Sequence, residues 1–244
     1  CDALNPVFFH YITTQTPYVV MKYAMTLDGK IATRTGHSKW ISGEASRGRV
    51  QQTRNALKGI MVGIGTVLND DPMLTCRIDG GRNPIRIICD SKLRIPLSSQ
   101  VVTTAKEVAT IVATIEPHVE YTRFWNEQKA ALEEQGVEVV VVKEVNDRLD
   151  LKDLMRQLGE RKIDGILLEG GSTLNYAALQ AGIVNRIEAY IAPKLFGGAG
   201  LYTPVGGEGV EYATEGIECR LLTADKIEED ILLTYDVLNK TDAE

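Results

Sequence analysis

Hydrophobic residues along this chain gather in short runs, and segments with the apolar spacing of helices lie between these runs. The runs predict strands at residues 18–26, 59–65, 84–90, 108–114, 137–142, 163–169 and 186–195. The intervening segments predict helices at residues 42–57, 121–136, 150–162 and 172–182, the first with Ser42 as its N-cap. Strands that alternate with helices of this length indicate an α/β fold with a mostly parallel central sheet and flanking helices.

The two ends of the chain depart from this alternation. Residues 1–17 contain two prolines and no clear period, so we interpret them as a linker or arm. A glycine-rich loop runs from Phe196 to Gly209, and residues 217–238 are expected to form two antiparallel strands at an edge of the sheet. No internal segment resembles a long linker, and residues 18–244 are expected to form one domain. Because the chain begins at Cys1 without a Met, we expect a missing N-terminal neighbour.

Composition narrows the function classes. A net charge of −6 argues against a general nucleic-acid-binding protein. The four cysteines are scattered, which is typical of reduced thiols in a cytoplasmic protein. No apolar run approaches the length of a membrane span, and no signal peptide is visible, so we expect no membrane partner.

Two common kinds of catalytic site have no complete signature. His118-x-Glu120 matches half of the zinc deaminase pattern, but the second half, P-C-x-x-C, is absent, so no metal site is expected. The nucleophile elbow G-x-S-x-G, which is typical of many hydrolases, is also absent, so no motif supports a hydrolase function.

Polar residues at strand ends are the remaining candidates. Lys22 shares a strand face with Ala24 and Thr26, and it needs an anionic or hydrogen-bonding partner if it is buried. The alternative is a lysine on an edge strand in solvent. In GIGTVLNDDP, Thr66 could cap a helix, and either acidic residue of Asp70-Asp71 could face a site or close the turn before Pro72.

The segment ILLEGGSTLNYAAL, residues 166–179, predicts a strand, two glycines and a helix. The free amides at the start of this helix would favour an anion by roughly 0.3–1 kcal/mol. A turn of this kind has a structural role about as often as it binds a ligand. The carboxylate of Glu169 beside it would also repel a phosphate. Arg54 lies on a helix stripe whose default interpretation is a solvated face, and Ser91 follows the strand at 84–90.

Taken together, these motifs resemble a known family. VVMKYAMTLDGKIAT, RNALKGIMVGIGTVLNDDPMLTCR, NPIRIICDSKLRIP and LLEGGSTLNYAAL occur in the order found in the reductase domain of the bifunctional riboflavin-biosynthesis deaminase/reductase (RibD-type). The resemblance covers about residues 8–238. It implies a dihydrofolate-reductase-like fold, an N-terminal deaminase domain in the intact chain and NADPH as hydride donor. The implied substrate is 5-amino-6-(5-phosphoribosylamino)uracil, whose ribosyl side chain is reduced to ribityl through ring opening and hydride delivery to C1′.

The resemblance also implies residue roles. Cofactor contacts are implied at Ala24, Trp40, Thr66, Asp70, Ser91, Thr104, Gly171, Ser172, Thr173, Leu174, Asn175, Tyr176 and Ala177. Substrate contacts are implied at Ser38, Arg54, Leu74, Arg77 and Glu169, where the arginines would meet a phosphate and Glu169 the donor groups of the pyrimidine. Lys22 and Asp70, with Glu169, are the expected catalytic residues, the first two for tuning or relaying a proton.

Alternative functions stay open from the sequence. A related reductase could act on the non-deaminated diaminopyrimidine, because the pyrimidine-reading end of the site is not settled by these motifs. A non-catalytic nucleotide-binding module could keep the same fold. The resemblance further implies a homodimer built through the C-terminal strands.

Overall fold

The computed structural model describes residues 5–200 and 202–238, and the chain divides into two compact units. The first unit consists of Cys1–Tyr18 and Arg54–Leu167, and the second of Val19–Thr53 and Leu168–Glu244. Neither unit is a continuous stretch of sequence. In the described ranges, no helix is long and apolar enough to cross a membrane.

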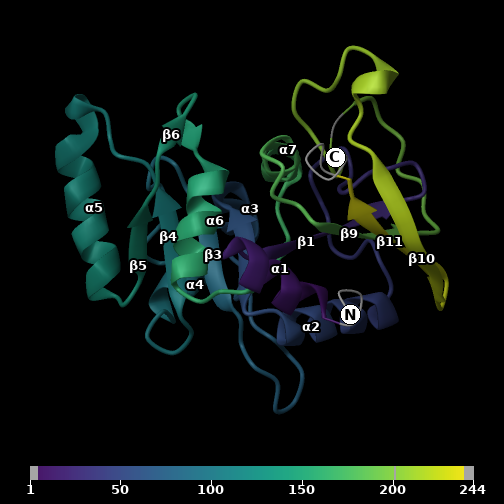
Figure 1. Ribbon diagram of the computed structural model, residues 1–244, viewed down its shortest axis with the longest axis horizontal. Helices are drawn as coiled ribbons and strands as arrows, with labels where there is room; N and C mark the ends of the chain where they lie inside the picture. Colours follow the sequence, from purple (N-terminus) through teal and green to yellow (C-terminus); the bar gives the residue numbers. More distant parts are fainter. Residues whose placement is uncertain (1–4, 201, 239–244) are drawn as a thin grey trace. The chain divides into compact units, whose positions relative to one another are not determined.

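The first unit contains the predicted parallel strands. Its strands are β2 (Gly59–Gly63), β3 (Ile85–Cys89), β4 (Thr110–Thr114), β5 (Glu138–Val141) and β8 (Gly165–Leu168), which ends at the unit boundary. Their order is β8-β2-β3-β4-β5, and β2 to β5 pair in parallel. The strands β3, β4 and β5 are labelled in Figure 1. Strands such as β4 are buried along their whole length, as expected for a parallel sheet covered on both faces.

The helices of the first unit are α1 (Pro6–Thr14), α3 (Ile64–Asp70), α4 (Gln100–Thr103), the 3₁₀ helix Val119–Tyr121, α5 (Thr122–Glu134) and α6 (Leu151–Glu160), and a short hairpin joins β6 (Glu144–Val145) to β7 (Arg148–Leu149). Two of these helices, α5 and α6, lie near predicted positions, whereas α1 and α4 were not predicted as helices. Residues of α5 pack beside β5 (Figure 1). The core between sheet and helices includes Ile60, Val112, Trp125 and Leu132, all buried.

Helix α1 occupies much of the predicted linker, whose residues 1–4 lie outside the described residues. Asn5 caps the helix by accepting a hydrogen bond from the Phe8 amide, and Pro6 is at a first-turn position that suits its fixed φ. The Tyr11 hydroxyl donates to the Gly159 carbonyl at 2.9 Å. The sequence did not reveal this helix because its apolar residues show no clear one-sided spacing, and the contact with α6 is tertiary.

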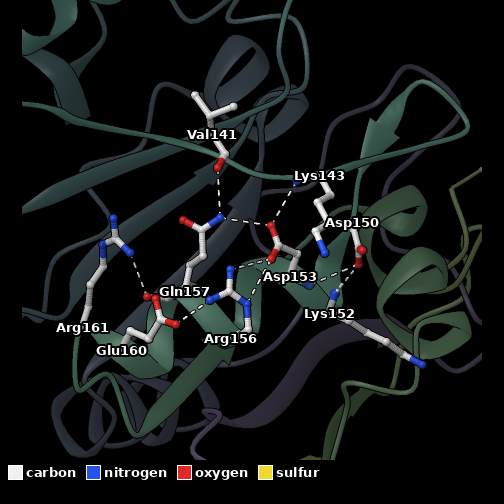
Figure 2. A network of polar contacts seen from close by, with 9 residues as sticks. All are labelled: Val141, Lys143, Asp150, Lys152, Asp153, Arg156, Gln157, Glu160 and Arg161. Atoms are coloured by element: carbon white, nitrogen blue, oxygen red, sulfur yellow. Dashed lines mark hydrogen bonds and ion pairs between the residues drawn. The ribbon is translucent and has the colours of Figure 1, made fainter.

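Helix α6 begins at an N-cap and carries a polar network on its exposed side (Figure 2). The Asp150 side chain accepts hydrogen bonds from the amides of Lys152 and Asp153. Burial alone would raise the pKa of Asp153, but hydrogen bonds from Arg156, Gln157 and the Lys143 amide hold that pKa below its usual range. These contacts tie α6 to the end of β5 and have a structural role.

The second unit carries the predicted C-terminal hairpin. Its strands are β1 (Tyr18–Thr26), β9 (Arg186–Ala192), β10 (Cys219–Ile227) and β11 (Asp230–Val237), in the order β10-β11-β9-β1. β1 and β9 are parallel, whereas β11 is antiparallel to both β9 and β10 (Figure 1). The expected antiparallel strands near the C-terminus are therefore confirmed.

Three further helices start or lie in the second unit: α2 (Glu44–Ala56), α7 (Ser172–Gln180) and the 3₁₀ helix Ala213–Glu215. The prediction of Ser42 as the N-cap of α2 was wrong by one residue, because α2 begins at Glu44 after Gly43. The Ser42 carbonyl instead accepts a hydrogen bond from the Arg47 guanidinium at 2.7 Å.

Candidate functional site

In the second unit, β1 and β9 place Lys22 beside two polar residues of β9. Lys22 is half-buried, and it is in register with Glu188, while Ala24 is in register with Tyr190. The Lys22 Nζ atom lies 5.6 Å from the centroid of the Tyr190 ring, within the range of a cation–π interaction. Lys22 therefore has the partners that a lysine in an apolar strand requires, and it is not an exposed edge-strand lysine.

Glu188 and Tyr190 form the centre of this cluster. The Tyr190 side chain is fully buried, and its hydroxyl lies 3.5 Å from the Glu188 Oε2 atom. Burial raises the pKa of Tyr190, and the nearby carboxylates of Glu188 and Glu169 raise it further. Lys22, an expected catalytic residue, thus contacts the tyrosine whose pKa the charge of Glu169 also raises.

Burial also raises the pKa of Glu188, against the opposing effects of a Thr53 hydrogen bond and the charges of Arg49 and Lys22. The Thr53 hydroxyl, on α2, donates to Glu188 Oε2 at 3.4 Å. The sequence reasoning missed Glu188 and Tyr190. The available signal was an acidic residue inside the apolar strand RIEAYIA, the same signal that drew attention to Lys22.

The turn after β8 opens onto the N-terminus of α7. Gly171 is the N-cap and has no side chain to bond the helix, and the first helical bond runs from the Asn175 amide to the Gly171 carbonyl. The amides of Ser172, Thr173 and Leu174 therefore have no carbonyl partner within α7. Gly171 itself is exposed, and a Cβ atom added to it would meet no atom within 4 Å.

Asn175 is the buried residue of this turn, with 1% of its surface exposed. Its Nδ2 atom donates to the Pro204 carbonyl at 2.9 Å, whereas its Oδ1 atom has no hydrogen-bond partner in the described residues. A Cβ atom at Gly170 would lie 2.8 Å from that Oδ1 atom, which explains the glycine. An unpartnered buried acceptor beside open helix amides is the arrangement that a polar ligand would complete.

The glycine-rich loop after β9 lies against α7. The Gly206 amide donates to the Ser172 carbonyl at 3.1 Å, and the Tyr176 hydroxyl lies 3.4 Å from the Gly209 carbonyl. A Cβ atom at Gly207 would overlap the Tyr176 ring, so the loop can approach the helix only through a glycine. The loop thereby covers the side of α7 that carries Tyr176.

Trp40 and Ser38, also in the second unit, lie in the segment between β1 and α2. The Trp40 ring is largely exposed, and the Arg47 guanidinium lies 4.6 Å from its centroid. The Lys194 ammonium donates to the carbonyls of Trp40 and Ile41, at 2.8 and 2.7 Å. Ser38 is half-buried two residues before Trp40.

The first unit holds the remaining expected residues, and one expectation there was wrong. Thr66 does not cap α3, because the helix begins at Ile64 with Gly63 as N-cap and Thr66 lies inside its first turn. Asp71 closes the turn before Pro72, with a left-handed φ of 38° and an Oδ1 atom that accepts from the Gln100 amide. Asp70, the last residue of α3, is exposed.

Arg54, Leu74 and Arg77 lie around one segment of the first unit. The Arg54 guanidinium donates to the Thr75 carbonyl at 3.1 Å, so Arg54 is not on a simple solvated face. Leu74 is buried and has a left-handed φ of 52°, while Arg77 is exposed. The Arg86 guanidinium also donates to this segment, to the Met73 carbonyl at 3.3 Å.

Ser91 and Thr104 are held by backbone contacts of the same unit. The Ser91 carbonyl accepts from the Thr114 hydroxyl at 3.2 Å. The Thr104 hydroxyl accepts from Arg86 Nη1 at 2.8 Å and donates to the Gln100 carbonyl at 2.6 Å. In the described part of the chain, no cluster of three or more His, Cys, Asp or Glu residues could hold a metal ion.

A mostly parallel sheet with an antiparallel C-terminal hairpin, and a glycine turn that exposes helix amides, define a dihydrofolate-reductase-like α/β protein. The family can be stated as well. The chain belongs to the RibD C-terminal domain family, whose sequence profile matches residues 17–233.

Similar proteins agree with this membership. The chain is 54% identical to the riboflavin biosynthesis protein RibD of Actinobacillus pleuropneumoniae, over 98% of this chain and 62% of that protein. It thus spans about three fifths of that relative's length. It is 41% identical to the 2,5-diamino-6-ribosylamino-4(3H)-pyrimidinone 5′-phosphate reductase of Methanothermobacter thermautotrophicus, over 91% of this chain and 98% of that protein.

A solved structure shows the same fold. The diaminohydroxyphosphoribosylaminopyrimidine deaminase/5-amino-6-(5-phosphoribosylamino)uracil reductase of Thermotoga maritima superposes with a TM-score of 0.79 at 30% identity. The match covers 97% of this chain and 61% of that chain.

Proposed function

We propose that this chain is an NADPH-dependent reductase that converts 5-amino-6-(5-phosphoribosylamino)uracil to the 5-phosphoribitylamino product in riboflavin biosynthesis. The observation that carries the proposal is the cluster in the second unit, where Lys22 contacts Tyr190, whose pKa the charge of Glu169 also raises, and where Glu169 directly precedes the turn of α7. The activity named for the Thermotoga protein supports the same reaction.

The residues of the α7 turn fit a nicotinamide dinucleotide. The amides of Ser172, Thr173 and Leu174 would donate hydrogen bonds to its diphosphate, and the unpartnered Asn175 Oδ1 would accept a hydrogen bond from one of its donor groups. The other proposed cofactor residues are Ala24, Trp40, Thr66, Asp70, Ser91, Thr104, Gly171, Tyr176 and Ala177. NADPH, when bound, supplies the hydride.

The chain's own residues would bind and orient the substrate. Arg54 and Arg77 are proposed to bind the phosphate, because an acidic protein needs local cations for an anionic ligand. Glu169 is proposed to accept hydrogen bonds from the pyrimidine N–H groups, and Ser38 and Leu74 are further proposed substrate contacts. Lys22 and Asp70 are proposed to tune or relay the proton that ring opening requires.

The test measures NADPH oxidation with the deaminated ribosylaminouracil phosphate. Glu169→Gln should lower kcat/KM by about tenfold or more, since a neutral amide can offer only one acceptor to the pyrimidine. Glu160→Gln is the matched control, because that exposed carboxylate on α6 pairs with Arg156 and should leave turnover unchanged. No oxidation of NADPH by the unaltered chain, either with this substrate or with the non-deaminated diaminopyrimidine, would refute the enzyme proposal and favour a nucleotide-binding module.

A second candidate substrate is the non-deaminated diaminopyrimidine. The named activity of the Methanothermobacter relative, which this chain matches along 98% of its length, favours that alternative. Parallel assays with the amino and the oxo pyrimidines would distinguish the two, and the larger kcat/KM identifies the substrate.

We further propose that the intact protein carries an N-terminal deaminase domain, acts in the cytoplasm and forms a homodimer through its C-terminal strands. The Thermotoga structure combines both activities in its name. Strand β10 is exposed along nearly its whole length, including the apolar side chains Leu221 and Leu222. Light scattering of the chain and of a Leu221→Asp variant tests the dimer.

A further inference from the structure

Glu188 is a carboxylic acid that none of the proposed catalytic or binding roles uses. It lies on β9, a strand paired on both sides, with β1 and with β11. Its β1 neighbour in register is Lys22, and its β11 neighbour in register is the neutral Thr234. Above it, α2 provides the Thr53 hydroxyl. An acid in such a position is costly unless its partners stabilise the charged form.

The side chain of Lys22 has a restricted choice of positions beside this acid. One wall is the Tyr190 ring, which is fully buried and therefore fixed by its packing. The Tyr190 hydroxyl lies next to the carboxylate of Glu188, so ring, carboxylate and ammonium form one group of three. Lys22, which is half-buried, therefore has fewer positions open to it than a fully exposed lysine.

The other charges around Glu188 are few. Arg49 on α2 is exposed and acts on Glu188 and Tyr190 through space, where solvent screens it. Glu169 acts on Tyr190. On the same strand, Arg186 pairs with Asp236 at 3.0 Å, so that positive charge is already balanced. Lys22 is thus the half-buried cation adjacent in register to Glu188.

We propose that Glu188 is a positioning residue that holds the Lys22 ammonium against the Tyr190 ring and keeps it protonated. The inference rests on the proposed function, because Lys22 is the group offered there for the proton. A carboxylate one strand away favours the charged lysine, whereas the apolar ring and burial favour the neutral amine. Glu188 therefore decides the pH range over which Lys22 remains a proton donor.

The experiment measures Lys22 directly, without substrate. Trace acetic anhydride labels the neutral amine, and mass spectrometry of the Lys22 peptide between pH 7 and pH 11 gives its titration midpoint. Glu188→Gln should lower that midpoint by about one unit, since an adjacent opposite charge shifts a pKa by that order. In turnover assays the alkaline limb of kcat should move by the same amount, while the KM for NADPH stays unchanged.

Three variants control for structural damage. Thr53→Val removes a hydrogen bond to the same oxygen of Glu188 but keeps the charge, so its midpoint should stay near that of the unaltered chain. Tyr190→Phe keeps the ring beneath Lys22 and tests the hydroxyl alone. Glu188→Asp keeps the carboxylate, and it should restore the midpoint even if Glu188→Gln folds poorly by circular dichroism.

An unchanged Lys22 midpoint in Glu188→Gln would overturn the inference, as would a shifted midpoint with an unchanged pH profile of kcat. Failure of the proposed function is a separate result. It would appear as absence of substrate-dependent NADPH oxidation in the unaltered chain, whereas the labelling midpoint requires no turnover.

Discussion

The hydroxyl of Ser46 donates a 2.6 Å hydrogen bond to the Oδ2 atom of Asp230, across 184 positions of sequence. The same oxygen accepts a 2.7 Å bond from the Gly43 amide. Gly43 precedes α2 and has no side chain with which to cap it, so the carboxylate of β11 stabilises the helix N-terminus from outside. A residue near the C-terminus thus sets where α2 begins.

Replacing Asp230 by Ala should lower the free energy of unfolding by about 1–3 kcal/mol, because the buried Ser46 hydroxyl and the Gly43 amide lose their acceptor. Urea unfolding followed by circular dichroism measures this change. Asp225→Ala is the control, since Asp225 is an exposed acceptor on β10 and its loss should cost less than about 0.5 kcal/mol. Equal effects of the two variants would contradict the capping role.

Gly207→Ala should detach the glycine-rich loop from α7. The new methyl group would overlap the Tyr176 ring, and the φ of 83° disfavours alanine as well. Gly209→Ala is the matched control, because Gly209 has a similar φ of 82° but open space around it. This substitution should lower the free energy of unfolding by only about 1 kcal/mol, the cost of a left-handed alanine. NADPH titration by fluorescence should show weaker binding for Gly207→Ala than for Gly209→Ala.

Adding Tyr176→Ala to Gly207→Ala should restore loop protection in hydrogen exchange, and failure to do so would rule out the overlap.

Arg86→Met should be strongly destabilising. The guanidinium is fully buried and donates to five oxygen atoms, among them Thr104 Oγ1 and the carbonyls of Met73 and Val108. Burial lowers the pKa of Arg86 to about 10, yet it remains charged at neutral pH. Losing all five bonds leaves the buried Thr110 hydroxyl and four partly buried acceptors without this donor, at a cost of about 3 kcal/mol or more in urea unfolding. Arg82→Met, which removes exposed bonds to backbone carbonyls, should cost far less.

The contact between Asp28 and the glycine-rich loop at Phe196 and Gly197 should weaken at low pH. A hydrogen bond from Thr26 lowers the pKa of Asp28 to about 2, aided by the amides of Gly197 and Phe196. A carboxylate whose folded pKa is depressed stabilises the fold above its unfolded pKa, and this contribution is lost as the pH falls from about 4 through about 2. NMR titration should place the Asp28 midpoint below 3, and Asp28→Ala should speed hydrogen exchange of the Gly197 amide. An ordinary midpoint near 3.8 would contradict the anchor.

Much of the fold was predictable because it depends on local pattern. β1 occupies residues 18–26 as predicted, since nine residues of strongly strand-forming character end at a glycine turn. The helices α5, α6 and α7 begin and end within a few residues of their predicted limits for similar reasons. Helix α1 and the true start of α2 were not predictable, because Gly159 and Asp230 stabilise them from distant parts of the chain.

The candidate site divides in the same way. The sequence by itself determined the strand–Glu169–Gly–Gly–helix turn and identified Lys22 as a lysine that needs a partner, since both follow from residue types at fixed spacing. Only the tertiary structure decided which partner Lys22 has, because strand register brings Glu188 and Tyr190 beside it from 166 and 168 positions away. Pairing between parallel strands depends on packing across the whole sheet, and no local pattern specifies the register.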